Sequence, residues 1–427
     1  MNARVGVIGT GYVGLSTGVC MAHLGHDVVC VDLDAAKIEK LQRGQATIVE
    51  HRLDELLFEG MEAGRLRFTT DAATAGADRD VVFLCVQTPQ GDDGAADMRH
   101  VHAALAGLEP HLKAGAVVVN KSTVPVGSAR SMTRTLTRTD IRIASNPEFL
   151  REGTAIDDFL SPDRVVVGCD DLAAAEKVAA LYAPLGATTL ITGPETSETI
   201  KYAANAFLAT KLSFVNAIAT LCEQVGADMV DVAKGMGYDR RIGADFLKPG
   251  PGWGGSCFPK DSRALVHIAD QHGYSFDLLR SVIESNDQQF DRMAAKVRSA
   301  AGGSLHGVTV AVWGLTFKAG TDDLRDSPSL EIVQRLQADG AIIRAYDPTV
   351  TGPRPGLPDG IQCCETSVQA CDGAAVLAVL TEWPTFTRVR PDDVAAVMPG
   401  RTIVDGRNLL DREAWTHAGF RHLGVGR

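Results

Sequence analysis

Arg-Val-Gly-Val-Ile-Gly-Thr-Gly-Tyr-Val-Gly, residues 4 to 14, decides the fold of this chain. Residues 4–9 form an apolar strand pattern that runs into a G-x-G-x-x-G turn. A helical stretch follows to His23, and a second strand over 27–31 is closed by Asp32. Strand, glycine turn, helix, strand and terminal acid together predict a dinucleotide-binding βαβ unit.

Each residue of this unit has its own expected role. Gly9 permits the tight turn, Gly11 lets the backbone approach a pyrophosphate, and Gly14 allows the helix to pack on the strand. Asp32 stands where a ribose 2′-hydroxyl is bound, and its charge repels a 2′-phosphate. The expected cofactor is therefore NAD rather than NADP.

Further apolar runs extend the pattern along the first half of the chain. They cover 81–86, 116–120, 141–144 and 165–168, and polar loops with Thr88, Thr123 and Glu148 follow the first three. In a parallel sheet such loops gather at the carboxyl edge, where ligands bind. We therefore expect these three residues to lie near the ligands.

The middle of the chain changes to a helical pattern. Residues 199–224 lack helix breakers and predict a helix of about seven turns, and further helices are expected over 260–272 and 276–300. A long, strongly apolar helix often forms an interface, so a homodimer or larger homo-oligomer through this helix is expected.

A second α/β section begins near residue 307. It has strand patterns over 308–313 and 341–346, a helix over 329–339, and later strands over 374–380 and 401–404. Asp347 closes the second strand as Asp32 does, but the three-glycine turn is absent. This half is either a structural echo of the first or the site of a different nucleotide.

The predicted fold class is α/β, with two Rossmann-like doubly wound parallel-sheet domains joined by a central helical domain with a long helix. The expected domains are 1–196, 197–302 and 303–427, in line with the length of 427 residues.

A net charge of -11 without a basic tail argues against a nucleic-acid partner. Nothing resembles a signal peptide, and no apolar run approaches the ~20 residues of a membrane span. Nine scattered Cys without C-x-x-C indicate reduced thiols in the cytoplasm, and no metal is expected.

One thiol stands apart from the others. Residues 252–261, Gly-Trp-Gly-Gly-Ser-Cys-Phe-Pro-Lys-Asp, place Cys257 in a glycine-rich loop ahead of a helix that Pro259 favours. The N–H groups and dipole of a helix start favour a thiolate, which is the nucleophilic form of Cys. A small buried hydrophobe is the alternative for any Cys.

Three motifs together resemble the UDP-glucose/GDP-mannose dehydrogenase family: the turn over 9–14, Asn-Pro-Glu-Phe-Leu-Arg-Glu-Gly over 146–153, and Gly-Gly-Ser-Cys-Phe-Pro-Lys-Asp over 254–261. The likeness covers essentially the whole chain and is strongest to bacterial members that act on UDP-glucose. Further family-like segments are 121–127, 198–211, 241–243, 317–328 and 405–408. The chain departs from the family at 46–51, which lacks two prolines, and at Gln87.

The resemblance implies an NAD-dependent four-electron oxidation of the UDP-glucose C6 alcohol to UDP-glucuronate, through a thiohemiacetal and a thioester on Cys257. Lys201 and Asn205 are four residues apart on one helix face and suit an oxyanion at C6. Asp261, and after it Glu148, is the candidate base, and Thr123 could position water. Any one of these acids alone is more often a cap or a surface group.

The resemblance also implies the binding residues. Positions that match the family's cofactor contacts are Gly9, Gly11, Tyr12, Val13, Gly14, Asp32, Lys37, Thr88, Thr123, Glu152, Lys260 and Arg325. Positions that match its substrate contacts are Glu148, Phe149, Leu150, Arg151, Glu152, Lys201, Asn205, Arg241, Phe246, Leu247, Lys248, Pro249, Gly250, Gly254, Lys318 and Arg407. Lys318 and Arg407 would meet the diphosphate, and Arg241 resembles an Arg that reaches across from a neighbouring subunit. Solvation at the surface is the alternative for these three.

Three other functions stay open at this point. The same chemistry could act on GDP-mannose or on a UDP-N-acetyl-hexosamine. A nucleotide-sugar sensor without activity would be favoured by loss of the Cys, Lys or Asp, all of which are present. A simple two-electron NAD dehydrogenase has no need of Cys257.

Overall fold

The computed structural model describes residues 2–89, 91 and 96–427, and the chain forms two compact units. The first unit comprises 1–204 and 263–273, and the second comprises 205–262 and 274–427. Two helices, α9 (Pro194–Val225) and α11 (Phe258–Gln271), continue along the chain from one unit into the other. The division into functional domains at 196 and 302 stays a prediction.

An eight-stranded sheet with the order β3-β2-β1-β4-β5-β6-β7-β8 forms the first unit. The β1 and β2 strands are parallel, with Arg4 opposite Asp27, as the glycine-turn pattern predicts. The β6–β7 pair is antiparallel through Ser145 and Gly168, so the expected parallel sheet is interrupted at this one pair. The strands are β1 (Arg4–Ile8), β2 (Asp27–Val31), β3 (Leu66–Thr69), β4 (Val81–Leu84), β5 (Val117–Asn120), β6 (Arg142–Ser145), β7 (Val165–Gly168) and β8 (Thr189–Thr192).

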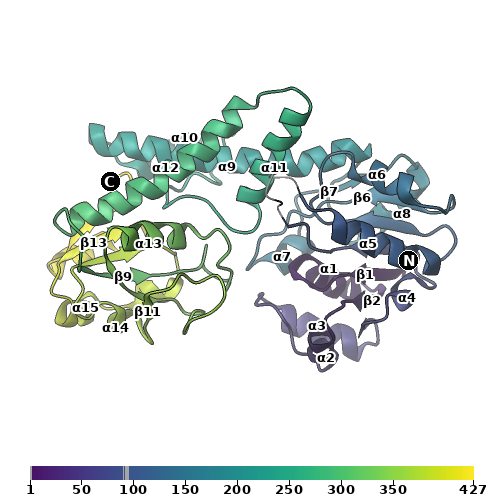
Figure 1. Ribbon diagram of the computed structural model, residues 1–427, viewed down its shortest axis with the longest axis horizontal. Helices are drawn as coiled ribbons and strands as arrows, with labels where there is room; N and C mark the ends of the chain where they lie inside the picture. Colours follow the sequence, from purple (N-terminus) through teal and green to yellow (C-terminus); the bar gives the residue numbers. More distant parts are fainter. Residues whose placement is uncertain (1, 90, 92–95) are drawn as a thin grey trace. The chain divides into compact units, whose positions relative to one another are not determined.

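Helices cover both faces of this sheet (Figure 1). Alternate residues of a strand point to opposite faces, so Val7 packs in the cluster with α1 while Ile8 packs in the cluster with α5. Two buried faces explain why the strands are apolar runs without polar alternation. The helices are α1 (Tyr12–His23), α2 (Ala35–Gln42), α3 (Leu53–Glu62), α4 (Ala72–Gly76), α5 (Arg99–Leu108), α6 (Ser128–Thr135), α7 (Ala155–Leu160) and α8 (Leu172–Leu181).

The second unit repeats this plan with a six-stranded, wholly parallel sheet in the order β11-β10-β9-β12-β13-β14. Val312 and Trp313, adjacent on β9, lie in separate buried clusters on its two faces. The predicted second α/β section is confirmed. Its strands are β9 (Thr309–Trp313), β10 (Ile342–Tyr346), β11 (Ile361–Cys363), β12 (Val376–Val379), β13 (Thr402–Asp405) and β14 (Arg421–Leu423); its helices are α10 (Met229–Gly237), α12 (Asp277–Ala300), α13 (Pro328–Ala338), α14 (Ser367–Ala370), α15 (Pro391–Val397) and α16 (Arg412–His417).

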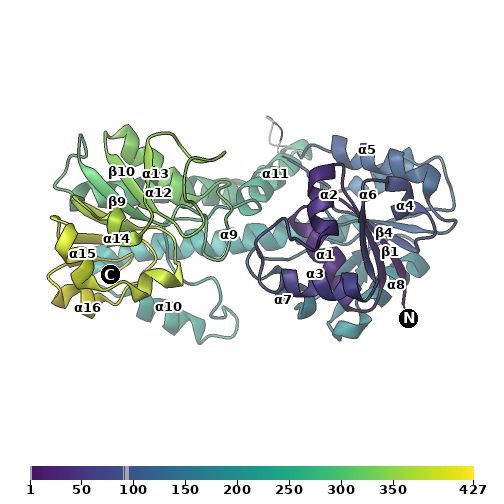
Figure 2. The ribbon, with the colours of Figure 1, turned by 90° about the horizontal axis from the view of Figure 1, so that it is seen from below.

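The long helix α9 is drawn as one uninterrupted helix in Figure 2. Within the described part of the chain, it alone is long and apolar enough to cross a membrane, with a mean hydropathy of 1.2 over its most apolar window. However, 44% of the window is buried inside the protein. Val215 and Ala219 belong to the core of the second unit, and Lys211 Nζ donates to the Ile242 and Asp245 carbonyl oxygens. Packing within the protein therefore accounts for part of its apolar composition.

Candidate active site

The glycine turn between β1 and α1 combines close packing with open space. A Cβ at Gly14 would lie 1.9 Å from the Gly9 carbonyl oxygen, so only glycine lets α1 approach the strand this closely. A Cβ at Gly11 would meet nothing within 4 Å. Gly11 also precedes α1 without a side-chain cap, so the first N–H groups of the helix are available to an anion. The turn thus has the features expected of a pyrophosphate site.

Asp32 ends β2 beside this turn. Its Oδ2 accepts hydrogen bonds from Thr10 N at 2.8 Å and Thr10 Oγ1 at 2.7 Å, and Lys37 Nζ lies 3.3 Å away. Burial raises the pKa of Asp32. The hydrogen bonds from Thr10 and Asp34 and the charge of Lys37 lower this pKa by more than burial raises it, so the net shift is downward. The carboxylate is therefore ionised, as the preference for NAD over NADP requires.

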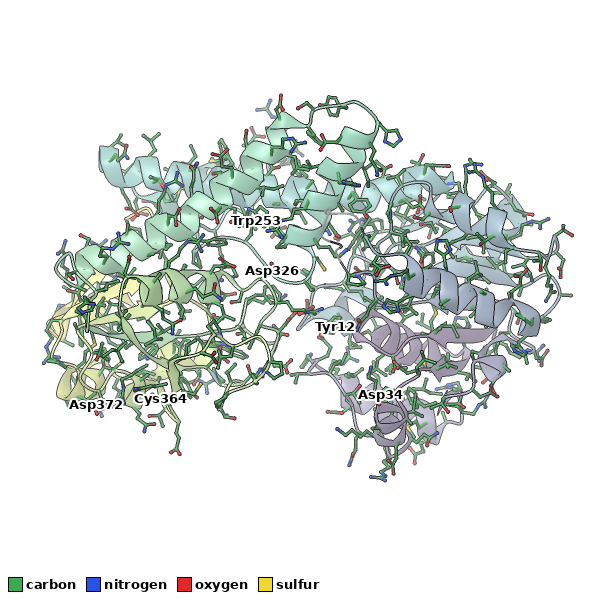
Figure 3. All side chains as sticks on the ribbon, in the orientation of Figure 1. Tyr12, Asp34, Trp253, Asp326, Cys364 and Asp372 are labelled. Atoms are coloured by element: carbon green, nitrogen blue, oxygen red, sulfur yellow. The ribbon has the colours of Figure 1, made fainter. Side chains whose placement is uncertain are left out.

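The other predicted cofactor residues of the first unit lie at the start of α1 and on the loops after β4, β5 and β6. Thr88 Oγ1 donates to the Thr123 carbonyl oxygen at 2.8 Å and so joins the loops after β4 and β5. Val13 is half-buried and packs against the core. Tyr12, labelled in Figure 3, accepts from Gly153 N at 2.9 Å, next to Glu152 in the chain.

Glu50 was not among the predicted site residues, but it contacts both Tyr12 and the backbone next to Glu152. Its carboxylate accepts from Tyr12 OH, from Gly153 N at 2.8 Å and from Ala155 N at 3.0 Å. It therefore connects the cofactor turn to the end of the 146–153 motif.

Glu148 and Lys201 form a buried ion pair, with Lys201 Nζ 2.9 Å from Glu148 Oε1. The Phe149 ring lies 5.5 Å from the ammonium and stacks on the Arg164 guanidinium at 3.6 Å. Burial raises the pKa of Glu148, but the charge and hydrogen bond of Lys201 outweigh it, so the net shift is downward. Leu150 N donates to the same carboxylate at 2.6 Å, and Arg151 pairs with Asp158. A charged pair thus lies at the end of β6.

Cys257 lies directly before α11 in the second unit, as predicted. Its carbonyl oxygen accepts from Asp261 N at 2.8 Å, and the thiol is half-buried with Ser256 Oγ at 3.6 Å. The Asp261 side chain is buried and accepts from Asn205 Nδ2 and from Lys260 Nζ, each at 2.6 Å. Asn205 and Lys260 therefore hold the predicted base one helical turn beyond the thiol.

Hydrogen bonds and close packing hold the loop ahead of Cys257 in place. Gly250 N donates to Asn216 Oδ1 at 2.8 Å, and Trp253, labelled in Figure 3, exchanges two hydrogen bonds with Asn286. A Cβ at Gly254 would lie 1.9 Å from the Asp326 carbonyl oxygen, so glycine is required there. These contacts fix the backbone that presents the thiol.

The remaining predicted residues of the second unit are substrate residues, except Arg325, which is a predicted cofactor contact. Arg407 lies against the loop, with a guanidinium nitrogen 3.4 Å from the position of a Cβ at Gly250, and it donates to the Leu380 and Phe317 carbonyl oxygens. Phe246 has a φ of 60°, which is a strained conformation for an aromatic residue and typical of functional sites. Leu247 and Pro249 are buried and Lys248 is exposed. Lys318 stacks over Phe317, while Arg241 and Arg325 form exposed pairs with Asp239 and Asp323.

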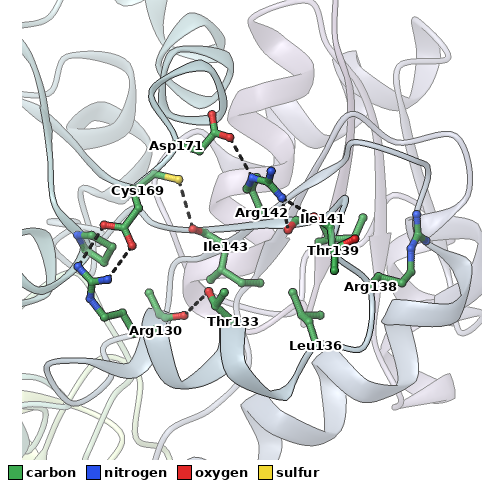
Figure 4. A pocket seen from close by; sticks show the side chains of 13 residues that line it. Arg130, Thr133, Leu136, Arg138, Thr139, Ile141, Arg142, Ile143, Cys169 and Asp171 are labelled. Atoms are coloured by element: carbon green, nitrogen blue, oxygen red, sulfur yellow. Dashed lines mark hydrogen bonds and ion pairs between the residues drawn. The ribbon is translucent and has the colours of Figure 1, made fainter.

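A hollow of about 520 Å³ lies elsewhere in the first unit, between α6, β6 and the segment that follows β7 (Figure 4). Its arginines are paired, Arg130 with Asp170 and Arg142 with Asp171, each at 2.9 Å. No predicted site residue lines it. The catalytic candidates are therefore identified by their contacts and not by this hollow.

The comparisons with known proteins cover nearly the whole chain. Models of the UDP-glucose/GDP-mannose dehydrogenase family match it in three parts: the NAD binding domain at residues 3–186, the central domain at 195–288 and the UDP binding domain at 311–412. The chain is 46% identical to a UDP-glucose 6-dehydrogenase of Rhizobium meliloti, over 99% of both chains. It is 43% identical to UDP-glucose 6-dehydrogenase YwqF of Bacillus subtilis, over 99% of this chain and 98% of the relative.

Two solved structures are similar throughout. A UDP-glucose dehydrogenase from Pyrobaculum islandicum has a TM-score of 0.91 at 35% identity, covering 100% of this chain and 98% of the other. A UDP-D-ManNAc dehydrogenase from Pyrococcus horikoshii has a TM-score of 0.88 at 28% identity, covering 99% of each chain.

Proposed function

The chain belongs to the UDP-glucose/GDP-mannose dehydrogenase family, and from this premise we propose that it oxidises the C6 alcohol of UDP-glucose to the carboxylate of UDP-glucuronate. The relatives of 46% and 43% identity are named for UDP-glucose, which favours this sugar. The observation that carries the chemistry is a half-buried thiol at the start of α11, one turn before a buried carboxylate.

NAD is the cofactor, and the first unit fits it. The open position at Gly11 and the uncapped start of α1 suit the pyrophosphate, and the ionised Asp32 suits a ribose diol. When bound, NAD takes up two electrons in each of the two oxidations.

Cys257 is the residue that lets one site carry an alcohol through to an acid. An aldehyde cannot be oxidised further until a nucleophile adds to its carbonyl carbon. The Cys257 sulfur adds to C6, a C–S bond forms, and the aldehyde oxygen takes a proton to give a thiohemiacetal. The second oxidation leaves a thioester. Water then attacks C6, the C–S bond breaks, and the carboxylate and the free thiol result.

The remaining roles follow from the contacts of each group. Asp261, held by Asn205 and Lys260, accepts the proton of the alcohol or of the attacking water. The Lys201 ammonium and the Asn205 amide stabilise negative charge on the C6 oxygen, and Glu148 orients Lys201. Thr123 positions water.

The decisive experiment counts NADH formed per sugar consumed. UDP-glucose, a UDP-N-acetyl-hexosamine and GDP-mannose are each incubated with NAD and the full chain. Two NADH per UDP-glucose, with UDP-glucuronate as product, is the expected result. A ratio near one would point to a two-electron dehydrogenase, reaction only with another sugar would correct the substrate, and no consumption of any sugar would leave a binding protein.

We also propose that α9 joins two copies of the chain. Phe207, Phe214 and Leu221 are spaced seven residues apart on this helix and are 64%, 51% and 50% exposed. Such spacing places them on one face, and an exposed apolar stripe favours a protein partner. Arg241, exposed beside Asp239, is then proposed to reach the neighbouring copy's substrate. The domain roles follow from this proposal. Residues 1–196 would bind NAD, residues 197–302 would form the dimer, and residues 303–427 would bind the nucleotide sugar. The buried cysteines of the described chain are free thiols, which supports a cytoplasmic location.

A further inference from the structure

Lys121 is a buried cation that none of the proposed steps uses. The residue directly follows β5 and is 4% exposed. Its Nζ donates to Asn146 Oδ1 at 3.1 Å and to Tyr182 OH at 3.2 Å. The rings of Phe83, Phe159 and Tyr182 lie 5.8, 5.9 and 5.6 Å from the nitrogen. Both hydrogen-bond acceptors of this ammonium in the described chain are neutral.

Local stability does not account for a lysine here. Burying an ammonium without a paired carboxylate costs free energy, and well-packed hydrophobic residues often replace buried charges without loss of stability. The cost is visible in the pKa of Lys121, which burial lowers to about 8. If Lys121 were replaced by Met, Asn146 Oδ1 would still accept from Tyr182 OH at 2.6 Å. No buried polar atom would lose its last partner.

The position of Lys121 joins two loops that carry predicted catalytic residues. Thr123 follows Lys121 by two residues, and Glu148 follows Asn146 by two residues. The other side of Asn146 is fixed, because its Nδ2 donates to the Val166 carbonyl oxygen at 2.7 Å. Lys121 therefore ties the loop after β5 to the first residue of the loop after β6. Its charge also acts on Glu148 and thereby on the Glu148–Lys201 pair.

We propose that Lys121 is a positioning residue of the reaction, which sets the 146–153 loop and the Glu148–Lys201 pair through Asn146. The proposal rests on the proposed function, since it concerns the same C6 oxidation. Lys121 touches neither sugar nor cofactor in this role. Because a misplacement of about 1 Å can cost 10²-fold in rate, loss of this tie should lower kcat far more than it lowers stability.

The test compares Lys121→Met and Lys121→Gln with the wild-type chain. Tm, NAD affinity by calorimetry, and kcat and KM for UDP-glucose are measured for each. Lys121→Met is expected to keep or raise Tm and to keep NAD affinity, with kcat lower by about 10²-fold. Lys121→Gln, which can still donate to Asn146, should fall between Lys121→Met and the wild type. If Lys121→Met does not fold, the kcat of Lys121→Gln tests the positioning role in its place.

Arg79→Met is the matched control, because Arg79 is 8% exposed and pairs with Asp27 ahead of β4, at the amino edge of the sheet. Its kcat should stay within about twofold of wild type even if Tm falls. Wild-type kcat in a folded Lys121 variant overturns the proposal, and so does an equal loss of kcat in Arg79→Met. Failure of the wild type to form two NADH per UDP-glucose overturns the proposed function instead.

Discussion

Half-buried Cys257 differs from the buried cysteines in its place directly before a helix. Its backbone accepts the first helical hydrogen bond of α11, so the thiol lies at the positive end of the helix dipole. Burial instead raises the pKa of Cys20 and of Cys85 to about 12, which keeps both as inert thiols. This difference in position supports the proposal that Cys257 is the nucleophile.

Replacing this thiol should separate catalysis from folding. Cys257→Ser is expected to lose UDP-glucuronate formation, because an alcohol is not ionised at neutral pH and does not replace a thiolate as the nucleophile. Tm and NAD affinity should be unchanged. Acid production is measured by chromatography of the reaction mixture. Cys222→Ser, at a buried core position of the same unit, is the control and should retain turnover at a lower Tm. Undiminished acid production by Cys257→Ser would show that the thiol is structural.

Two glycines of the cofactor turn should respond to alanine in opposite ways. At Gly11 the new methyl group enters open space, so Gly11→Ala should keep Tm but weaken NAD binding, by about tenfold for each 1.4 kcal/mol lost. At Gly14 the methyl group would lie 1.9 Å from a carbonyl oxygen, so Gly14→Ala should lower Tm by several degrees. Thermal melts and NAD titrations measure both effects. Equal losses of Tm in the two variants would contradict this assignment of roles.

At the scale of elements, α9 organises the first unit by capping a neighbouring helix. The Glu198 carboxylate accepts from Gly127 N at 2.6 Å and Ala129 N at 2.8 Å, at the start of α6. Lys201 lies one turn further along α9, so the helix that carries this cation also fixes the end of the Thr123 loop. Burial raises the pKa of Glu198 to about 7, with the backbone hydrogen bonds opposing it.

This raised pKa predicts a pH dependence of stability with a defined sign. The folded chain holds the Glu198 proton more tightly than the unfolded chain, so its contribution to the free energy of unfolding falls as pH rises from about 4.5 to about 7. Glu198→Gln cannot ionise, so its Tm relative to wild type should be higher at pH 8 than at pH 5. Glu195→Gln is the control: Arg130 lowers the pKa of Glu195, so its effect should not change over this range. Equal differences at both pH values for Glu198→Gln would contradict the shift.

The sequence predicted the elements better than their contacts. The strands and helices that were predicted hold within a few residues, because apolar runs and glycines mark them. The short strands β3, β8, β11 and β14 were missed, and β8 is a mostly exposed edge strand. Strand ends also identified Thr88, Thr123 and Glu148. The Glu148–Lys201 and Asn205–Asp261 pairs join residues 53 and 56 positions apart, which no local pattern encodes.

Across the whole molecule, the two βαβ units each have an acid after their second strand, and the surroundings of these two acids differ. Asp32 keeps 16% of its side chain exposed beside the glycine turn. Asp347 ends β10 in the same way but is buried, and it accepts from Leu315 N at 2.8 Å and Trp383 Nε1 at 3.1 Å. The sequence left open whether the second unit repeats the first as a nucleotide site. At this position the acid serves the fold, so any nucleotide must be held by other groups there.

The size of the assembly follows from the apolar stripe on α9. Phe214→Glu places a charge at its centre, so the dimer should weaken by at least about 2 kcal/mol, the scale of an interface hot spot. Light scattering should give twice the 45.3 kDa chain mass for wild type and one chain mass for the variant. Leu278→Glu, at a position of the same unit that is 66% exposed on α12, is the control and should stay dimeric. Because Arg241 is proposed to complete the neighbouring copy's site, the monomeric variant should also lose activity in proportion. A wild-type monomer, or a fully dimeric Phe214→Glu, would remove α9 as the interface.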